Sequence, residues 1–166
     1  VLGEIDLDPA SCECANRVVQ ARRFYTREEN GLMYPWYGRI WLNPPYGKTQ
    51  QGRASNLEYF TRYLVEQYQR GQVTKAILLI PVNTATRWFE ALWQYPIYFP
   101  HFRIRFYNEQ GPSHDVSFGT CFVYLGPHEQ RFIEVFQRFG HIVKAISPLQ
   151  TRPIVQELWI EKEVLA

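Results

Sequence analysis

The apolar positions of the chain follow two different spacings, which predict strands and helices in turn. The nearly all-apolar run from Lys75 to Val82 is typical of a central strand that is buried on both faces. Apolar residues recur at helical spacing from Ser55 to Arg70, and Gly71 follows, so we expect an amphipathic helix that ends there. A shorter run, Arg39 to Leu42, predicts a strand that stops directly before Asn43.

The rest of the chain continues this alternation. We expect further strands at 4–7, 97–107, 117–125 and 142–146, and helices at 11–19 (capped by Ser11), 86–95 and 128–139. Strands that alternate with helices indicate an α/β fold, and the close spacing of strands between 97 and 125 indicates a local antiparallel hairpin. The pattern predicts one domain over residues 1–147, and a C-terminal extension over 148–166 whose last helix, 155–164, packs on it.

Composition limits the function only loosely. A length of 166 residues suits one domain, and a net charge of +2 with a pI near 8.5 is too mild to indicate nucleic-acid binding. Any DNA contact would therefore depend on local basic clusters, each of which also fits ordinary solvated surface. The candidates are Arg22, Arg23 and Arg27, then Lys48 and Arg53, then Arg103 and Arg105.

Cysteine usage points to a reducing compartment. The three cysteines, Cys12, Cys14 and Cys121, form no paired framework, which suits reduced thiols in a cytosolic protein. No second Cys or His pair stands at zinc-ligand spacing, so we expect no structural metal. No apolar run is long enough to span a bilayer, so we expect no membrane segment.

The strongest chemical signal is the turn Asn43-Pro44-Pro45-Tyr46, which follows the predicted strand 39–42. Two prolines restrict the backbone and bias Asn43 toward an extended conformation, so its amide is held in one direction. The amide oxygen and the Pro44 carbonyl can both accept hydrogen bonds from one amino group, and Tyr46 offers a flat face for a heterocycle. This combination indicates chemistry on an amino nitrogen.

Asn-Pro-Pro-Tyr resembles the motif of the methyltransferases that use S-adenosylmethionine to methylate amino groups. Further segments match in order and approximate spacing, and together they resemble the phage-type DNA N6-adenine methyltransferase (Dam) family over about residues 1–140. The matching segments are Asp6-Leu7-Asp8-Pro9-Ala10-Ser11, Asn30-Gly31-Leu32, Trp36-Tyr37-Gly38-Arg39 and Asn43-Pro44-Pro45-Tyr46-Gly47.

The resemblance implies a single-domain, Rossmann-like methyltransferase sheet, mostly parallel, with an antiparallel hairpin near its C-terminal end. It implies that Asp6, Asp8 and Pro9 bind S-adenosylmethionine, with Asp8 favoured because it stands in the turn, and that Asn30 contacts the adenine of this cofactor. Asn43, Pro44, Pro45 and Tyr46 would be the catalytic residues, and Tyr46 would stack on an adenine flipped out of duplex DNA.

The family likeness also implies a cytoplasmic enzyme of phage or prophage origin. Because the chain begins with Val1, we expect further residues upstream that complete the cofactor pocket. Sequence-reading loops are expected at 48–55 and 108–115. Three alternatives stay open: methylation of RNA adenine, methylation of a protein glutamine, and a noncatalytic DNA-binding relative.

Overall fold

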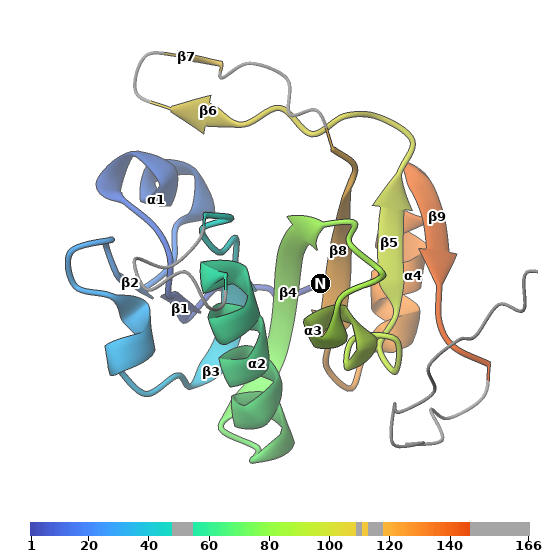
Figure 1. The fold of residues 1–166 in the computed structure, drawn as a ribbon, viewed down its shortest axis with the longest axis horizontal. Coiled ribbons are helices and arrows are strands. Elements are labelled where there is room, and N and C mark those ends of the chain that lie inside the picture. The colour runs from blue at the N-terminus through green and yellow to red at the C-terminus, as the bar shows by residue number, and fades with distance from the viewer. Residues whose placement is uncertain (48–54, 109–110, 113–117, 147–166) are drawn as a thin grey trace, which may run out of the picture.

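A mixed β-sheet with helices on both faces forms the core of the computed structural model (Figure 1). The structure describes residues 1–47, 55–108, 111–112 and 118–146. The predicted C-terminal extension, 148–166, lies outside the described residues, as does its expected helix.

Seven strands make up the main sheet within this described part. Their order is β2-β1-β3-β4-β8-β5-β9. The strands are β1 (Leu7–Asp8), β2 (Arg23–Phe24), β3 (Gly38–Leu42), β4 (Val73–Pro81), β5 (Ile97–Pro100), β8 (Thr120–Leu125) and β9 (Gly140–Val143). Two further short strands, β6 (Tyr107–Asn108) and β7 (Gly111–Pro112), pair with each other beyond the edge of this sheet (Figure 1).

Helices connect and cover these strands. They are α1 (Glu13–Val19), the 3-10 helix η1 (Gly31–Met33), α2 (Asn56–Gln69), α3 (Arg87–Glu90) and α4 (Glu129–Phe136). In Figure 1, α2 and α3 lie in front of the sheet and α4 lies behind it.

The prediction of a mostly parallel sheet is wrong. Strands β2, β1, β3 and β4 run parallel, but every pairing beyond β4 is antiparallel, and these pairings hold the larger share of the residue pairs. The cause is β8, which inserts between β4 and β5 and runs against both. The expected hairpin near 97–125 is thus one part of an antiparallel half-sheet.

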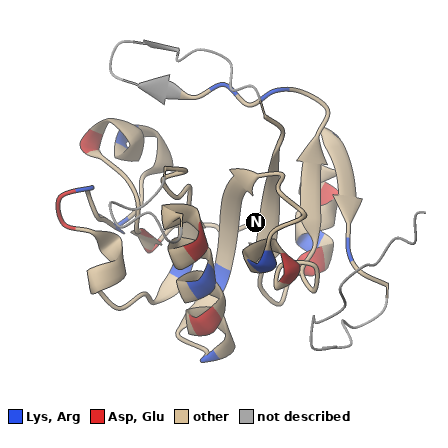
Figure 2. Cartoon of the chain, viewed as in Figure 1, with Lys and Arg blue, Asp and Glu red and all other residues tan. Residues whose placement is uncertain are grey.

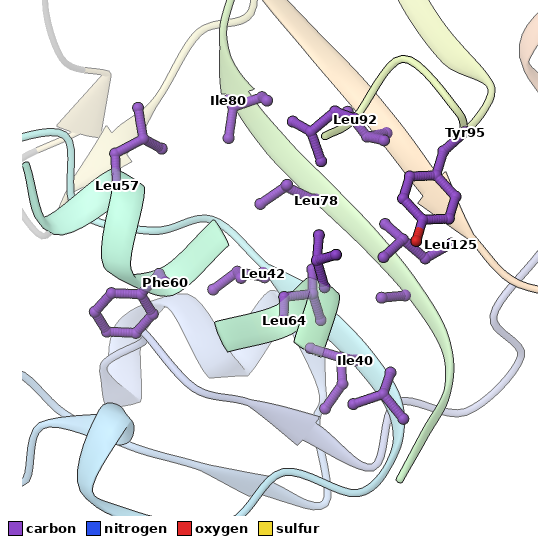
Figure 3. Close-up of a cluster of buried hydrophobic side chains, with 14 of the residues drawn as sticks. Ile40, Leu42, Leu57, Phe60, Leu64, Leu78, Ile80, Leu92, Tyr95 and Leu125 are labelled. Atoms are coloured by element: carbon purple, nitrogen blue, oxygen red, sulfur yellow. The ribbon is translucent and has the colours of Figure 1, made fainter. Parts of the chain in front are cut away.

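Strand β4 is buried on both faces, as its apolar sequence predicts. One face carries the larger core cluster, where side chains of α2 meet those of β3 and β4; Figure 3 shows Leu57, Phe60 and Leu64 of α2 close to Ile40, Leu42, Leu78 and Ile80. The other face carries a smaller cluster, formed by Leu2, Ile77, Tyr98, Tyr124 and Phe132. At about 25 cal/mol per Å² of apolar area removed from water, burial of these large side chains is the main stabilising term.

The ends of α2 agree with the sequence, whereas the start of α1 does not. The backbone N–H of Glu58 donates to the side-chain oxygen of Ser55 (3.2 Å), and Gly71, with φ of 74°, ends α2. Ser11 is not the cap of α1: Cys12 takes that place, and its Sγ accepts from the Ala15 N–H at 3.4 Å. Ser11 instead stays in the turn beside Asp8.

The direction of β8 brings distant segments to one edge. Pro81, the last residue of β4, pairs with Thr120, the first residue of β8, so β8 begins where the parallel strands end. Because β5 runs against β8, β5 also ends at this edge. Residues 101–106 therefore leave the sheet, and residues 118–119 rejoin it, on the same side as the turn at Asn43.

Candidate active site

Asp8 and Asn43 stand at the carboxyl ends of two adjacent parallel strands. Leu7 of β1 pairs with Ile40 of β3, so Asn43 lies two residues further along its strand than Asp8. With neighbouring strands about 4.8 Å apart and a rise of about 3.3 Å per residue, the two backbones are roughly 8 Å apart. Strand order reverses here, since β2 lies on one side of β1 and β3 on the other, and such a crevice is the usual ligand site of α/β sheets.

The turn after β3 carries Asn43 at this end of the sheet. Asn43 is partly exposed, Pro44 is buried and Pro45 is exposed, so the first proline anchors the turn in the core. The hydroxyl of Tyr46 donates to Oδ1 of Asn43 at 2.8 Å and lies 3.4 Å from the carbonyl oxygen of Leu79. The two ends of the predicted motif are therefore joined by a hydrogen bond.

Two phenylalanines contact the ring of Tyr46. Phe106 and Phe118 make edge contacts with it, at centroid distances of 6.2 and 5.8 Å. Phe118 is a site residue that was not predicted from the sequence. The only sequence signal that it shares with Phe106 is an aromatic residue near one end of a predicted strand. Burial, with a smaller effect from Cys121, holds the pKa of the Tyr46 hydroxyl well above its usual value, so this hydroxyl keeps its proton.

Asp8 is a buried carboxyl with no cationic partner within the described residues. Its residue is 2 % exposed, and burial raises its pKa to about 6, against the opposing effects of the Ser11 hydroxyl and the Ala10 N–H at 3.3 Å. The Ser11 Oγ is itself buried, and it makes no hydrogen bond of normal geometry with any described residue. Among the described residues, then, the buried acid has no cation beside it and the buried hydroxyl has no hydrogen-bond partner of normal geometry, which favours a site for a polar, cationic ligand.

Asp6 has a different environment from Asp8. Its carboxylate accepts from the Arg39 guanidinium at 2.8 and 3.0 Å and from the Arg39 backbone N–H at 2.9 Å. These contacts hold the pKa of Asp6 down, at about 2. Arg39 lies near the amino end of β3, so Asp6 is tied to the part of the strand away from Asn43.

The turn at Asn30 packs directly on the turn at Pro9. A Cβ added to Gly31 would stand 2.0 Å from the Pro9 carbonyl oxygen, so only glycine allows this approach. Asn30 is exposed, with φ of 55°, and its Oδ1 accepts from the Leu32 N–H at 3.3 Å. The structure thus brings Asp8, Pro9 and Asn30 into one neighbourhood, next to the strand that bears Asn43.

The predicted basic clusters lie in different surroundings. Arg22 is paired with Glu4 and lies 3.7 Å from Asp6, and the Arg23 guanidinium lies over the Tyr25 ring at 4.8 Å from its centroid. Arg103 and Arg105 lie on the segment that leaves β5 at the active-site edge, and Figure 2 shows basic positions along it. Lys48 and Arg53 lie outside the described residues.

The residues at this edge fit S-adenosylmethionine in their chemistry. The cofactor carries ribose hydroxyls and two cationic groups, which are suitable partners for the Ser11 hydroxyl and the Asp8 carboxylate. In the part of the chain that the structure describes, no group of three or more His, Cys, Asp or Glu side chains could hold a metal ion. Across the same residues, no helix has the length and apolar character needed to cross a membrane.

Comparison with known proteins gives one result. A sequence model described as DNA N-6-adenine-methyltransferase (Dam) matches residues 2–124, which include all eight predicted site residues. No curated protein matches the chain.

Proposed function

The chain belongs to the DNA N-6-adenine-methyltransferase (Dam) family, and on this basis we propose that it methylates the N6 amine of adenine in double-stranded DNA with S-adenosylmethionine as donor. The observation that carries the proposal is the position of Asn43 near the buried Asp8, which has no cationic partner among the described residues, at the carboxyl ends of two adjacent parallel strands. This arrangement supports a site in which Asn43 accepts hydrogen bonds from an amine and Asp8 faces a cationic donor.

Asn43 and Pro44 orient the amine in this proposal. The second lone pair of Asn43 Oδ1 and the Pro44 carbonyl accept the two N–H bonds of the adenine N6, so the nitrogen lone pair points into the crevice. When bound, S-adenosylmethionine supplies an electrophilic methyl group on a sulfonium. The protein forms no covalent bond to the substrate, and one N6 proton passes to water after transfer.

Asp8 holds the donor in place. Its carboxylate accepts from the ribose hydroxyls or faces the cationic methionyl part, while Pro9 and Asn30 shape the pocket. We assign this contact to Asp8 rather than Asp6, because the Asp6 carboxylate already accepts three hydrogen bonds from Arg39.

In this proposal the segments beside the turn at Asn43 contact the DNA duplex. Adenine N6 is paired and stacked inside a duplex, so the base must be extruded, and the Tyr46 ring is its platform. Arg103 and Arg105 stand where they can contact phosphates next to the extruded base. The loops expected to read the target sequence, 48–55 and 108–115, lie mostly outside the described residues.

The proposal also covers the origin and location of the protein: a phage- or prophage-encoded enzyme that works in the bacterial cytoplasm.

Nucleoside mass spectrometry tests the proposal directly. Duplex DNA is incubated with the protein and S-adenosylmethionine and then digested, and we expect N6-methyladenine with wild type but not with Asn43→Ala. RNA and a glutamine-bearing release factor are tested in parallel with a labelled donor. Methyl transfer to either of these, with none to DNA, would replace the proposed substrate.

The noncatalytic alternative has its own signature. A DNA-binding relative would fail to bind the methyl donor in a calorimetric titration and would bind DNA with strong salt dependence. We expect instead that the donor binds with a measurable heat and that Asp8→Asn weakens this binding. A titration without heat, together with salt-sensitive DNA binding, would overturn the enzymatic proposal.

A further inference from the structure

The amide of Asn43 has to be held in one plane for the proposed reaction. An asparagine side chain turns easily about its last torsion, which is broad rather than confined to sharp wells. A turned amide would present its NH2 group, a donor, to the N–H bonds of the substrate. The prolines after Asn43 restrict its backbone but not this torsion, so another group must set it.

The hydroxyl of Tyr46 is the group that the structure places there. It has one proton and two nearby acceptors, and the shorter contact, 2.8 Å to Asn43 Oδ1, takes the proton in preference to the 3.4 Å contact with the Leu79 carbonyl. Because the amide oxygen is planar with two lone pairs, a donor on one of them leaves a single free direction on the other.

The ring of Tyr46 is itself held in place by two other aromatic rings. Phe106 and Phe118 contact its ring edge-on, and they come from the two segments that leave and rejoin the sheet at this edge. Aromatic contacts of this kind are worth about 0.5–1.5 kcal/mol each, beyond their buried area. The raised pKa of the hydroxyl keeps the donor protonated throughout the neutral range.

We propose that Tyr46 is a positioning residue, whose hydroxyl fixes the amide plane of Asn43 so that one oxygen lone pair faces the target amine. This role is separate from stacking, which needs only the ring. The inference rests on the proposed function, since it concerns the same site and the same reaction.

Tyr46→Phe separates the hydroxyl from the ring. We expect the single-turnover rate of methyl transfer to fall on the order of 10-fold, as for loss of one hydrogen bond that acts in the transition state. The KM for DNA, and the fluorescence of 2-aminopurine at the target position, which reports base extrusion, are expected to stay unchanged. A structural or stacking role would change these two readouts as well.

Three further variants complete the test. Tyr37→Phe removes the hydroxyl of a tyrosine that is 55 % exposed and lies before the amino end of β3, and it is expected to match wild type. Replacement of Tyr46 by 4-aminophenylalanine restores a donor and is expected to recover the rate. In an Asn43→Ala background, Tyr46→Phe is expected to cause no further loss, because the group that it positions is already gone.

The outcomes distinguish this inference from the function on which it rests. An active wild type with an equally active Tyr46→Phe variant would overturn the positioning role alone, as would an equal rate loss in the Asn43→Ala background. If the melting temperature of Tyr46→Phe is well below that of wild type, the 4-aminophenylalanine protein is the deciding variant. A 4-aminophenylalanine protein that is folded but still transfers the methyl group slowly would overturn the positioning role. A wild type that transfers no methyl group to DNA would overturn both proposals.

Discussion

Gly31 rests against the carbonyl oxygen of Pro9, so closely that a methyl group on its Cα would stand 2.0 Å from that oxygen. This contact joins the turn after β1 to the start of η1, two segments more than twenty residues apart in the chain. The proposed cofactor pocket depends on their being joined.

Gly31→Ala is therefore expected to push the two turns apart. We expect a loss of about 1–3 kcal/mol in the free energy of unfolding, as for overpacking of a close contact, and a cofactor affinity lowered by at least about 10-fold. Thermal melts and calorimetric titration measure these effects. Gly47→Ala is the matched control for stability, because its Cβ would meet nothing within 4 Å; a Gly31→Ala protein as stable as this control would contradict the close packing.

Asn43→Ala is expected to separate turnover from cofactor binding. Removal of the amide should lower turnover on the order of 100-fold or more, because a preorganised polar group at the reacting centre is lost. Cofactor affinity should change little, since Asp8 and the Asn30 turn are untouched. An equal loss of cofactor affinity would instead assign Asn43 to the cofactor pocket. Gln72→Ala serves as the control, because Gln72 is exposed and lies near the start of β4.

Asp8 is expected to make cofactor binding depend on pH. Its pKa in the free protein is raised to about 6, so it is largely protonated at pH 5 and ionised at pH 7. Because the ionised form holds the cationic donor, affinity should rise about 10-fold between pH 5 and pH 7. Asp8→Asn should bind weakly with no step near pH 6, and a wild-type affinity that is flat across this range would contradict the assignment.

The same raised pKa has a consequence of opposite sign for stability. The folded protein binds a proton at Asp8 more tightly than the unfolded chain does, so this group favours folding at low pH. That contribution is lost as pH rises from about 4 to about 6. In thermal melts, Asp8→Asn should therefore gain stability relative to wild type as the pH is raised across this window.

Asp6 is expected to contribute to stability and not to binding. Its pKa is lowered to about 2, mainly by hydrogen bonds from Arg39, so its contribution is present above about pH 4 and is lost as pH falls toward 2. Since the Asp6 and Arg39 side chains are 28 % and 25 % exposed, solvent screening limits the effect to about 1 kcal/mol. At pH 7, Asp6→Asn should have a lower melting temperature than wild type and the same cofactor affinity. A lower cofactor affinity would indicate that Asp6 does line the cofactor pocket.

The local features of the site could be predicted from the sequence. The strand before Asn43, the turn at Asp8 and the buried strand β4 each follow from apolar runs and proline positions within a few residues. The capped start of α2 at Ser55 does so as well. These features depend on neighbours in the chain, and periodicity and turn chemistry report such neighbours well.

The long-range features could not be predicted in the same way. The apolar pattern of a strand such as β8 is the same in either direction. Its antiparallel position between β4 and β5 therefore could not be predicted from the sequence of the strand itself. The ring contacts of Tyr46 with Phe106 and Phe118 likewise join residues that are far apart in the sequence. The contact between Gly31 and Pro9, the residue after Asp8, likewise joins segments that are far apart in the sequence.

Strands β5 and β8 are immediate neighbours, and the polypeptide between them starts and finishes at the catalytic side of the sheet. Because both ends of this segment are held by neighbouring strands, a change in its length or composition need not alter the pairing of the sheet. The same segment carries Phe106, which contacts Tyr46, so any replacement of it has to supply an aromatic ring at that point if the hydroxyl of Tyr46 is to keep its position.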